Sequence, residues 1–479
     1  MTTGIKLAFG RLILLSDDEI VRIHETSLKT LQEIGIKVLS KKVQSLLAEK
    51  GAEVDASRST VKIPSSLVDE AIKKAPKEMT LCGRNPKSDL KLPTTDFPFV
   101  APNGCTTFMN DLETGEKRMT KASDLRDFAI LCDYLDGIDF FWSVCVPTEI
   151  RPPLQYIRGF AIALNNIQKH IQFHALSAEE ARWQIKLASA VVGDEEKLKR
   201  RPIFSSVNCP VAPLVFEKRS SEAMVELAKA GIPVAPMSMA SSGVTAPATI
   251  AGTLAIVNSE SLAALVILEC ANPSAPMIYT AESCPADMRT GEFNYSAPET
   301  ILIGAGVAQM ARFYGIPCYP TGIGMDETPR DWEELIAFSQ SLVFDALSRG
   351  DISSGLGSLE NAAVSSLEQV ILDVEAWKYA RAYLRSFRVD EETLGFEAIS
   401  EVGPGGNFLG LKHTLKHFQQ EIWLKKEASI LELSTAGSLV ERANEKVRQI
   451  LATHVPLPVE EEVQREINQI LRNCEKEML

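Results

Sequence analysis

Short runs of hydrophobic and β-branched residues recur along the middle of the chain at regular intervals. Eight of them occur 29 to 44 residues apart, beginning near Pro98, Ile138, His170, Ile203, Ile232, Pro276, Ile316 and Asp351. A strand with its crossover helix and turns needs about 30 residues, so each interval has room for one such unit. The pattern therefore predicts eight parallel strands that alternate with helices.

Helix-start signals fall in several of these intervals. Ser177-Ala-Glu-Glu180 and Ser296-Ala-Pro-Glu299 have the spacing of capping boxes, in which Ser and Glu side chains bond backbone N–H groups of the first turn. Thr328-Pro329 places a proline at a first helical position. Apolar residues then recur at helical spacing and predict helices over 179–192, 299–314, 330–347 and 361–384.

Eight strand–helix units over about 290 residues fit a TIM (β/α)8 barrel, which typically takes about 250 residues. A doubly wound sheet is the alternative, but no G-x-G-x-x-G opens the first strand-to-helix turn. We therefore expect an α/β protein with a catalytic barrel over 98–388. An N-terminal extension of helices and small strands covers 1–97, and its first helix follows the capping box Ser16-Asp-Asp-Glu19. A C-terminal helical extension covers 389–479.

Composition narrows the class of protein without changing this fold. The chain has 63 acidic and 50 basic residues, a net charge of −13 and no block of Lys or Arg, which argues against nucleic acid as a partner. Nine scattered cysteines without a C-x-x-C pair favour a reducing cytoplasm over a disulfide framework. The most apolar stretch, 245–268, contains Asn258 and Glu260, so we expect a buried helix there and no membrane span. A soluble enzyme or binding protein remains, and a homo-oligomer stays open.

The loops that follow the expected strands should carry the chemistry, because barrel enzymes place their active sites at the carboxyl ends of the strands. These loops contain aromatic residues, methionines and carboxylates but few lysines. Such a composition attracts cations, and quaternary ammonium groups are the usual ligands of aromatic cages. The candidate residues are Phe141, Trp142, Glu149, His174, Asn208, Tyr279, Glu282, Tyr319, Asp326, Glu327 and Gly355.

Several of these candidates also have a purely structural interpretation. Aromatic residues at strand ends are more often packing residues than ligands, and we expect Trp142 to lie at least partly in the core. His174 lies in an apolar run and is equally compatible with a core histidine. Asp326 and Glu327 would also stabilise the N-terminus of the next helix.

Five stretches of the chain resemble the signatures of one family. The glycine- and alanine-rich run over 236–254 resembles that of the trimethylamine methyltransferase superfamily, as do 355–360 and 366–370. The tail motif over 402–409 is similar to the C-terminal signature of that family, and 15–24 resembles its first helix. Together the matches extend from residue 15 to residue 423, so the resemblance covers most of the chain.

The resemblance implies a TIM barrel that moves a methyl group from an amine to the cobalt of a corrinoid. This chain lacks the D-x-H-x-x-G pattern of corrinoid-binding domains, so the corrinoid is expected on a cognate partner protein and not as a tightly bound cofactor. Archetypal members carry pyrrolysine in the barrel, and this sequence has none. Glu327 aligns with the Lys of a Ser-Asp-Ala-Lys-like run in relatives, and Asn407 stands where the family has His.

These departures favour a quaternary amine as the substrate. A tertiary amine must be activated before its methyl group can leave, which the resemblance implies is the purpose of pyrrolysine. A quaternary amine already carries a full positive charge and needs no such activation. Members without pyrrolysine resemble demethylases of glycine betaine, proline betaine or carnitine. We expect glycine betaine, which would give dimethylglycine, with proline betaine, carnitine or another quaternary amine as alternatives.

On this hypothesis the aromatic side chains surround the ammonium group, and the carboxylates supply negative potential. His174, Asn208 and the backbone of 241–245 would donate hydrogen bonds to the carboxylate of a betaine. The residues expected to bind the substrate are Phe141, Trp142, His174, Asn208, Tyr279, Tyr319 and Gly355. The expected catalytic carboxylates are Asp326, Glu327 and Glu282.

Two functions from other classes remain as alternatives. Glu149, His174 and Glu282 could hold a metal in a TIM-barrel lyase or hydrolase, whereas the methyltransferase hypothesis includes no metal bound by this chain. A non-catalytic betaine-binding protein of the periplasm would need a signal peptide, and none is recognisable.

Overall fold

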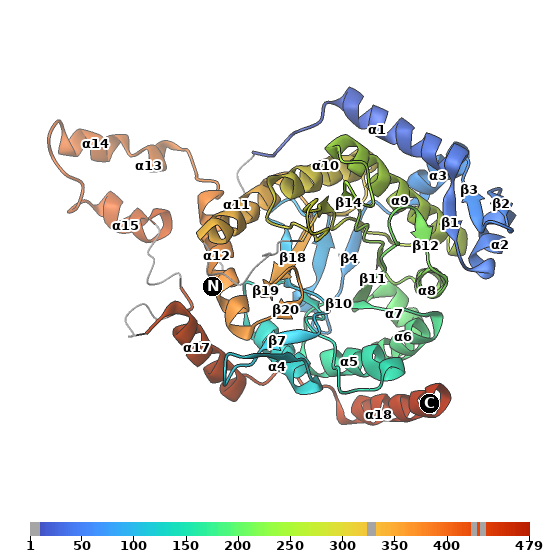
Figure 1. Cartoon of the computed structure of the whole chain (residues 1–479). Helices are drawn as coiled ribbons and strands as arrows, with labels where there is room; N and C mark the ends of the chain where they lie inside the picture. Colours follow the sequence, from blue (N-terminus) through green and yellow to red (C-terminus); the bar gives the residue numbers. More distant parts are fainter. Residues whose placement is uncertain (1–9, 323–331, 423–428, 432–436) are drawn as a thin grey trace.

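The computed structural model describes residues 10–322, 332–422, 429–431 and 437–479. Its centre is a ring of short parallel strands surrounded by helices (Figure 1). In chain order the strands of the ring are β6 (Phe99–Pro102), β9 (Phe141–Trp142), β10 (Ile171–His174), β11 (Phe204–Val207), β13 (Val234–Ala235), β15 (Tyr279–Thr280), β17 (Cys318–Tyr319) and β18 (Ile352–Leu356). Each begins within three residues of a predicted start, which confirms the eight strand–helix units.

Backbone hydrogen bonds link each strand to the next and close the ring. β9, β10, β11 and β13 pair in parallel, as do β15 with β17 and β18 with β6. Further backbone bonds join the remaining neighbours, among them Ile278 N–H to Val234 O at 2.9 Å, Asp351 N–H to Cys318 O at 2.8 Å, and Asp139 N–H to Val100 O at 2.8 Å. The fold is therefore the (β/α)8 barrel that the strand pattern predicts.

Helices follow the strands and cover the outside of the ring. They are α4 (Ala122–Tyr134), α5 (Pro152–Asn166), α6 (Ala178–Val192), α7 (Glu195–Arg200), α8 (Lys218–Lys229), α9 (Ile250–Ala271), α10 (Pro298–Tyr314), α11 (Trp332–Ser348) and α12 (Leu367–Tyr383). At the start of α6 the Ser177 hydroxyl accepts the Glu180 N–H at 3.2 Å, as predicted. The other half of the predicted capping box does not form, because Glu180 Oε2 accepts the Leu176 N–H at 2.8 Å instead of the Ser177 N–H. The capping box predicted at Ser296 is wrong, because Pro298 takes the first helical position and its fixed φ makes Ala297 the N-cap.

The final barrel helix also begins later than its apolar pattern indicates. α12 starts at residue 367 and not at 361, because β19 (Ser358–Leu359) and β20 (Val364–Ser365) form an antiparallel hairpin before it. β20 pairs with β7 (Phe108–Asn110), which pairs with β8 (Lys117–Met119). On other loops β14 (Ser241–Ser242) pairs with β16 (Cys284–Pro285). These short strands form a rim around the carboxyl end of the barrel.

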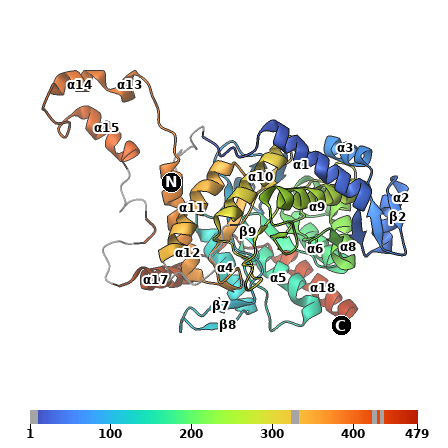
Figure 2. The same ribbon diagram turned by 45° about the horizontal axis from the view of Figure 1, so that its top comes forward.

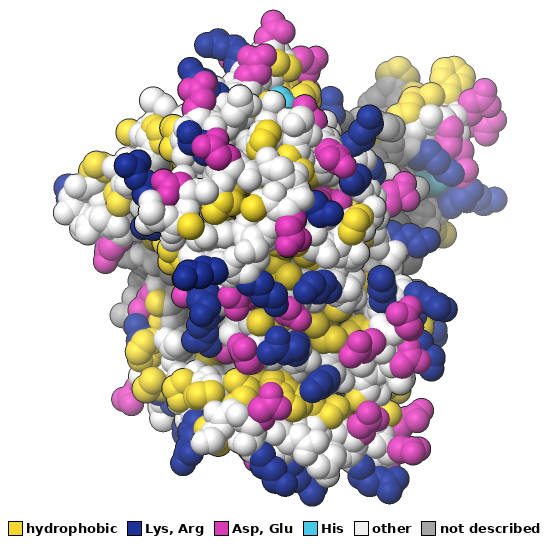
Figure 3. Space-filling model, turned by 90° about the vertical axis from the view of Figure 1, so that its right-hand side faces the viewer, with side chains coloured by type: hydrophobic (Ala, Val, Ile, Leu, Met, Phe, Trp, Pro, Cys, Tyr) yellow, Lys and Arg dark blue, Asp and Glu magenta, His cyan; other side chains and the backbone are white. Residues whose placement is uncertain are grey.

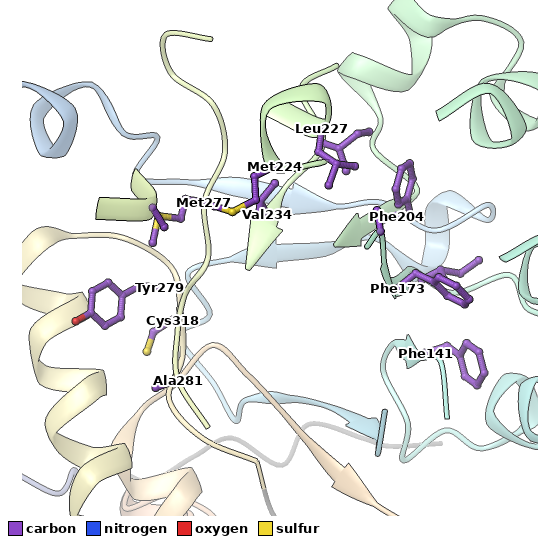
Figure 4. Packing of buried hydrophobic residues seen from close by; sticks show 14 of the residues in the cluster. Phe141, Phe173, Phe204, Met224, Leu227, Val234, Met277, Tyr279, Ala281 and Cys318 are labelled. Atoms are coloured by element: carbon purple, nitrogen blue, oxygen red, sulfur yellow. The ribbon is translucent and has the colours of Figure 1, made fainter. Parts of the chain in front are cut away.

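Alternation along the strands divides the buried side chains into two layers. Phe141, Phe173 and Tyr279 belong to the large core between the strands and the surrounding helices (Figure 4). Phe140 and Tyr319 belong to a second core inside the ring. The amino end of the ring is closed by a hairpin of β4 (Met79–Leu81), the short helix η2 (Pro86–Ser88) and β5 (Leu90–Leu92), whose leucines join this inner core.

The N-terminal extension is tied to a barrel loop by one sheet. Its elements are α1 (Asp17–Lys29), the π-helix η1 (Thr30–Ile34), β1 (Ile36–Val38), α2 (Lys41–Glu49), β2 (Glu53–Asp55), β3 (Thr60–Lys62) and α3 (Ser65–Lys74). β12 (Val215–Phe216), from the loop after β11, pairs in parallel with β1. The Ser16 capping box is confirmed at the start of α1. On the face over α2, α8 and α18, basic and acidic side chains are interspersed (Figure 3).

The C-terminal extension leaves the barrel and then returns to it. α13 (Glu391–Leu394), α14 (Phe396–Val402) and α15 (Lys412–Glu421) project away from the barrel (Figure 2). α17 (Leu439–Thr453) packs on α12 and α4, and α18 (Glu461–Met478) packs on α5 and α6. The apolar helix α9, long enough to cross a membrane, is mostly buried beneath α1, α3, α8 and α10. All nine cysteines are free thiols.

Candidate functional site

Four of the expected residues come together inside the carboxyl end of the barrel. Trp142, His174 and Tyr319 end β9, β10 and β17, and Glu282 follows β15 by two residues. The rings of Trp142 and His174 stack with centroids 5.7 Å apart, and Trp142 meets Tyr319 edge to face at 6.2 Å. Burial, and after it the negative charge of Glu282, raises the pKa of Tyr319, so the carboxyl group lies within electrostatic range of the phenol. We call these four residues the mouth cluster.

A hydrogen bond fixes the relative orientation of Trp142 and His174. The indole Nε1–H donates to His174 Nε2 at 2.9 Å. Because an indole N–H can only donate, Nε2 is the unprotonated nitrogen of the imidazole, and the proton lies on Nδ1. That nitrogen bonds the backbone of Val207, and burial lowers the pKa of His174 to about 4. The imidazole is therefore neutral at neutral pH, and its contacts serve to position Trp142.

Gly104, which is not among the expected site residues, allows Trp142 to lie against the backbone. A Cβ atom at this position would lie 2.3 Å from the indole ring. Real Cβ atoms do not approach so closely, so any larger residue would displace the indole. The sequence signal for this contact is the Asn103-Gly104 turn directly after the first barrel strand.

Glu282 is a half-buried residue whose carboxyl group has little around it to stabilise its charge. Its backbone N–H donates to Ser238 O at 2.8 Å, which fixes the loop after β15. Oε1 lies so close to Gly322 that a Cβ atom there would be 2.6 Å away. Among the described residues no cationic side chain forms an ion pair with Glu282, and burial raises its pKa to about 7. The group is therefore poised to lose its proton when a cation enters.

A hydrogen bond of its hydroxyl group fixes the position of Tyr319. The Tyr319 hydroxyl forms a hydrogen bond with the Ser354 hydroxyl on β18, and the ring is fully buried. Burial, together with the charge of Glu282, raises the pKa of Tyr319 well above its ordinary value. The phenol therefore stays neutral, and it lies within electrostatic range of the carboxyl group of Glu282.

The structure does not bring the other described candidates to this cluster. Phe141 and Tyr279 face outward to the helices, where the Tyr279 hydroxyl donates to Asn258 Oδ1 at 2.8 Å. Asn208 is buried and donates from Nδ2 to Ala175 O at 2.7 Å, so it supports the backbone of a neighbouring loop. Glu149 is exposed and accepts the Ala122 N–H at 2.7 Å at the start of α4.

The remaining candidates are Gly355, Asp326 and Glu327. Gly355 has φ +119° in β18, where the pairing with β6 shifts register, a backbone conformation that suits glycine. Asp326 and Glu327 lie outside the described residues. The described residues contain no group of three or more His, Cys, Asp or Glu arranged to hold a metal ion, and Glu149 lies apart from His174 and Glu282.

Comparison with known proteins places the chain in one family. A sequence profile of the family described as trimethylamine methyltransferase (MTTB) matches residues 2–478. The chain is 32% identical over 466 residues to a trimethylamine methyltransferase of Desulfitobacterium hafniense, which covers 96% of this chain and 94% of that protein. It is 28% identical over 473 residues to a glycine betaine methyltransferase of the same species, covering 97% and 98% of the two chains.

A solved structure agrees with the fold. The monomethylamine methyltransferase of Methanosarcina barkeri superposes with a TM-score of 0.51 at 13% identity, covering 98% of this chain and 95% of that one. At this identity the likeness concerns the fold alone, whereas the profile extends over nearly the whole chain. The profile and the identity to curated relatives establish the membership. The chain belongs to the trimethylamine methyltransferase family.

Proposed function

We propose that this methyltransferase takes a methyl group from a quaternary amine, with glycine betaine favoured, and passes it to the Co(I) corrinoid of a separate protein. The observation that carries the proposal is the edge-to-face pair of Trp142 and Tyr319 at the carboxyl end of the barrel, with the half-buried carboxyl group of Glu282 within electrostatic range of Tyr319. Aromatic faces and a carboxylate both attract a cation that cannot donate hydrogen bonds. The mouth cluster therefore suits an ammonium group whose substituents are all carbon.

Binding of such a cation would reverse the effect of burial on Glu282. Burial alone disfavours the ionised carboxyl and raises its pKa to about 7. A positive charge within a few ångströms favours the ionised form and lowers that pKa again. The cation and the carboxylate then stabilise each other inside the barrel. The site is thus most negatively charged when the substrate is bound.

The chemistry that follows is an in-line displacement. The Co(I) electron pair attacks one methyl carbon, the C–N bond breaks, and its electron pair stays on nitrogen to leave a neutral tertiary amine. Cobalt is oxidised formally to Co(III) as the Co–C bond forms, and glycine betaine gives dimethylglycine. No proton has to be moved, so the residues of this chain contribute binding, orientation and exclusion of water.

The choice of a quaternary amine rests on the sequence and on one relative. The chain contains no pyrrolysine, the residue that archetypal family members carry in the barrel. A relative of similar length is named glycine betaine methyltransferase, while others are named for trimethylamine. Asp326 and Glu327 keep their proposed role of adding negative potential to the site. Proline betaine and carnitine share the same ammonium head and are the next candidates.

The rim of the barrel offers a surface to the protein that carries the corrinoid. Five exposed apolar residues lie on five different strand-to-helix loops, each at the carboxyl end of the ring. They are Met119, Leu176, Val211, Val244 and Met288. A methyl acceptor has to approach the same end, and exposed apolar side chains around a site are typical of protein contacts. The nine free thiols fit a reducing cytoplasm as the location of both proteins.

The proposal is tested by incubating the purified chain with cob(I)alamin and a panel of amines, following methylcobalamin by absorbance. We expect methylation with glycine betaine and none with trimethylamine. Activity with a different quaternary amine would keep the reaction and change the substrate, whereas activity with trimethylamine alone would overturn the choice of a quaternary amine. Failure of every amine both to bind in calorimetry and to be demethylated would overturn the proposal. Metal analysis of the same sample tests the lyase or hydrolase alternative.

A further inference from the structure

Asp345 on α11 is a buried carboxyl group that the proposed methyl transfer does not use. The residue is 5% exposed, and within the described part of the chain neither of its carboxyl oxygens has a hydrogen-bond partner. Burial raises the pKa of Asp345 to about 7, although the nearby Ser353 hydroxyl on β18 lowers it in part. Burying a charge without a partner is costly, so an unpaired buried carboxyl group favours a positively charged ligand.

A small polar cavity of about 20 Å³ lies next to this carboxyl group. Helix α10 packs on α11 (Figure 1) and on β17, and the cavity lies where the three elements meet. Its polar lining comes from all three: Ser341, Asp345 and Ser348 of α11, Thr300 of α10, and Thr321 and Gly322 directly after β17. A space of this size accommodates one particle as large as a water molecule.

Three hydroxyl groups of the cavity can accept a hydrogen bond from a ligand but cannot donate one. Each already donates its single proton to a backbone oxygen: Thr300 to Asn294 at 3.0 Å, Ser341 to Phe338 at 2.8 Å and Ser348 to Phe344 at 2.8 Å. A hydroxyl group has one proton and two lone pairs, so only lone pairs remain for a ligand. Ser341, Asp345 and Ser348 are spaced by four and three residues, which places their oxygens on one face of α11.

We propose that this cavity binds an alkali-metal cation, Na⁺ or K⁺. The carboxylate of Asp345 and the hydroxyl oxygens around it are the hard oxygen ligands that such cations take. One carboxylate balances one positive charge. Mg²⁺ usually keeps several of its water molecules, and the cavity has no room for them. The ion is redox-inert and takes no part in the methyl transfer, so the proposal is independent of which amine the enzyme uses.

The position of the cavity gives the ion a structural role beside the mouth cluster. Gly322 lines the cavity and also lies against Glu282, whose Oε1 would be 2.6 Å from a Cβ atom at Gly322. Thr321 packs closely on α10, where a Cβ atom at Gly304 would lie 2.8 Å from its Cγ2. An ion that bonds oxygens of both helices and of Thr321 would hold the end of β17 in place. We therefore expect the ion to stabilise the fold.

Thermal unfolding of the full chain in sodium, potassium and Tris chloride at equal ionic strength tests the proposal. Tris is a cation too large for the cavity and carries no methyl group on nitrogen, so it reports the general effect of salt. We expect Na⁺ or K⁺ to raise Tm by about 2–3 °C relative to Tris when the ion is about a hundredfold above its Kd. Equilibrium dialysis followed by atomic absorption should find one bound ion per chain.

Asp345→Asn should abolish the difference in Tm between the salts, because the amide is neutral and cannot balance the charge of the ion. Asp373→Asn is the matched control. Asp373 is also buried with its pKa raised to about 7, but its oxygens already accept the Gly357 N–H and the Gln369 amide, both at 2.7 Å. The control should unfold at a lower temperature in every salt and keep the difference between the salts.

Ser341→Ala keeps the proposal testable if the variant at Asp345 does not fold. It removes one oxygen ligand and should weaken binding of the ion by about fivefold or more. Equal Tm values in the three salts, or the absence of a bound alkali ion after dialysis, would overturn the proposal and leave a water molecule as the occupant. An unchanged difference in folded Asp345→Asn, or an unchanged affinity in Ser341→Ala, would also refute it, because the ion would then bind elsewhere.

Discussion

Glu282 is held near the midpoint of its titration at neutral pH, because burial raises its pKa to about 7. Only the ionised carboxyl attracts a quaternary ammonium group. Below the raised pKa the site therefore loses affinity as protons compete with the cation, and above it the affinity levels off. We predict that the Kd for glycine betaine falls by about tenfold per pH unit as the pH rises toward 7, and is then constant. Isothermal titration calorimetry across the pH range checks this profile.

Glu282→Gln should remove both the charge and the pH dependence. The amide cannot ionise, so the affinity should be flat with pH and weaker at pH 8 by about 10- to 100-fold, as for the loss of one charged contact. Glu149→Gln is the control, since that carboxylate is exposed at the start of α4 and should leave the profile unchanged. A variant at Glu282 that keeps the wild-type pH profile would show that another group titrates.

Substitution of Gly104 should weaken amine binding as much as substitution of the residues proposed to face the substrate. In Gly104→Ala the added methyl group would lie 2.3 Å from the Trp142 ring, so the indole must move and its hydrogen bond to His174 is lost. We predict at least about tenfold weaker amine binding and a changed near-ultraviolet circular dichroism signal, with the far-ultraviolet signal retained. Gly410→Ala adds the same methyl group into open space and should change neither. Wild-type affinity in Gly104→Ala would mean that the indole position does not matter.

Sequence reasoning located the strand ends of the site but not which side chains point inward. Phe140, Phe141 and Trp142 are consecutive aromatic residues, and alternation requires that neighbours face opposite sides. In a parallel barrel both faces of a strand are buried, so hydropathy does not reveal which set faces inward. Phe141 and Tyr279 turned out to face the helices. Whether Trp142 and Glu282 bind the substrate stays a prediction.

Helix α9 shows how one buried charge can join separate elements. Glu260 accepts the Ser238 hydroxyl at 2.6 Å and the Leu214 N–H at 2.7 Å, and burial raises its pKa. Ser238 follows β13, and Leu214 precedes β12, which pairs with the N-terminal extension. The single carboxyl group therefore connects the barrel, its long buried helix and the strand that joins the extension.

Replacing Glu260 should destabilise the fold, by an amount that depends on how many of its two hydrogen-bond donors lose their acceptor. Glu260→Leu leaves a buried hydroxyl and a part-buried N–H without acceptors, and we predict a loss of about 2–4 kcal/mol in the free energy of unfolding. Glu260→Gln retains one acceptor and should lose less than half as much. Urea unfolding of the two variants beside the wild type measures both values. Equal losses would show that packing, and not hydrogen bonding, is what the carboxyl group contributes.

The elements that sequence patterns predicted best are those with local causes. A capping serine and its helix are only a few residues apart, and Ser16 and Ser177 both cap as expected. The start of α12 was missed because the β19–β20 hairpin depends on pairing with β7, more than 250 residues away. The sheet of β12 and β1 likewise joins distant residues. Periodicity and capping signals contain no information about such pairings.

At the scale of the whole molecule, substitutions of the exposed apolar residues of the rim should slow methyl transfer to the corrinoid protein more than methyl transfer to free cob(I)alamin. Met288→Glu adds a charge to a side chain that is 71% exposed on the loop after β15. We predict that kcat/KM with the corrinoid protein falls by about tenfold or more relative to the rate with free cob(I)alamin. Val455→Glu, at an exposed residue between α17 and α18, is the surface control. Equal effects on both acceptors would place Met288 in the substrate site instead of the docking surface.

By itself the sequence determined the eight-unit barrel, the family and the type of residue at each strand end, because periodicity, capping and short motifs act within a few positions along the chain. Only the tertiary structure decided that Trp142, His174 and Tyr319 meet in one cluster, that burial raises the pKa of Glu282, and that residues 384–422 leave large apolar side chains exposed. Burial, electrostatic potential and the partners of a hydrogen bond depend on residues brought together from hundreds of positions apart. These properties are therefore set by the folded barrel and cannot be derived from local sequence patterns.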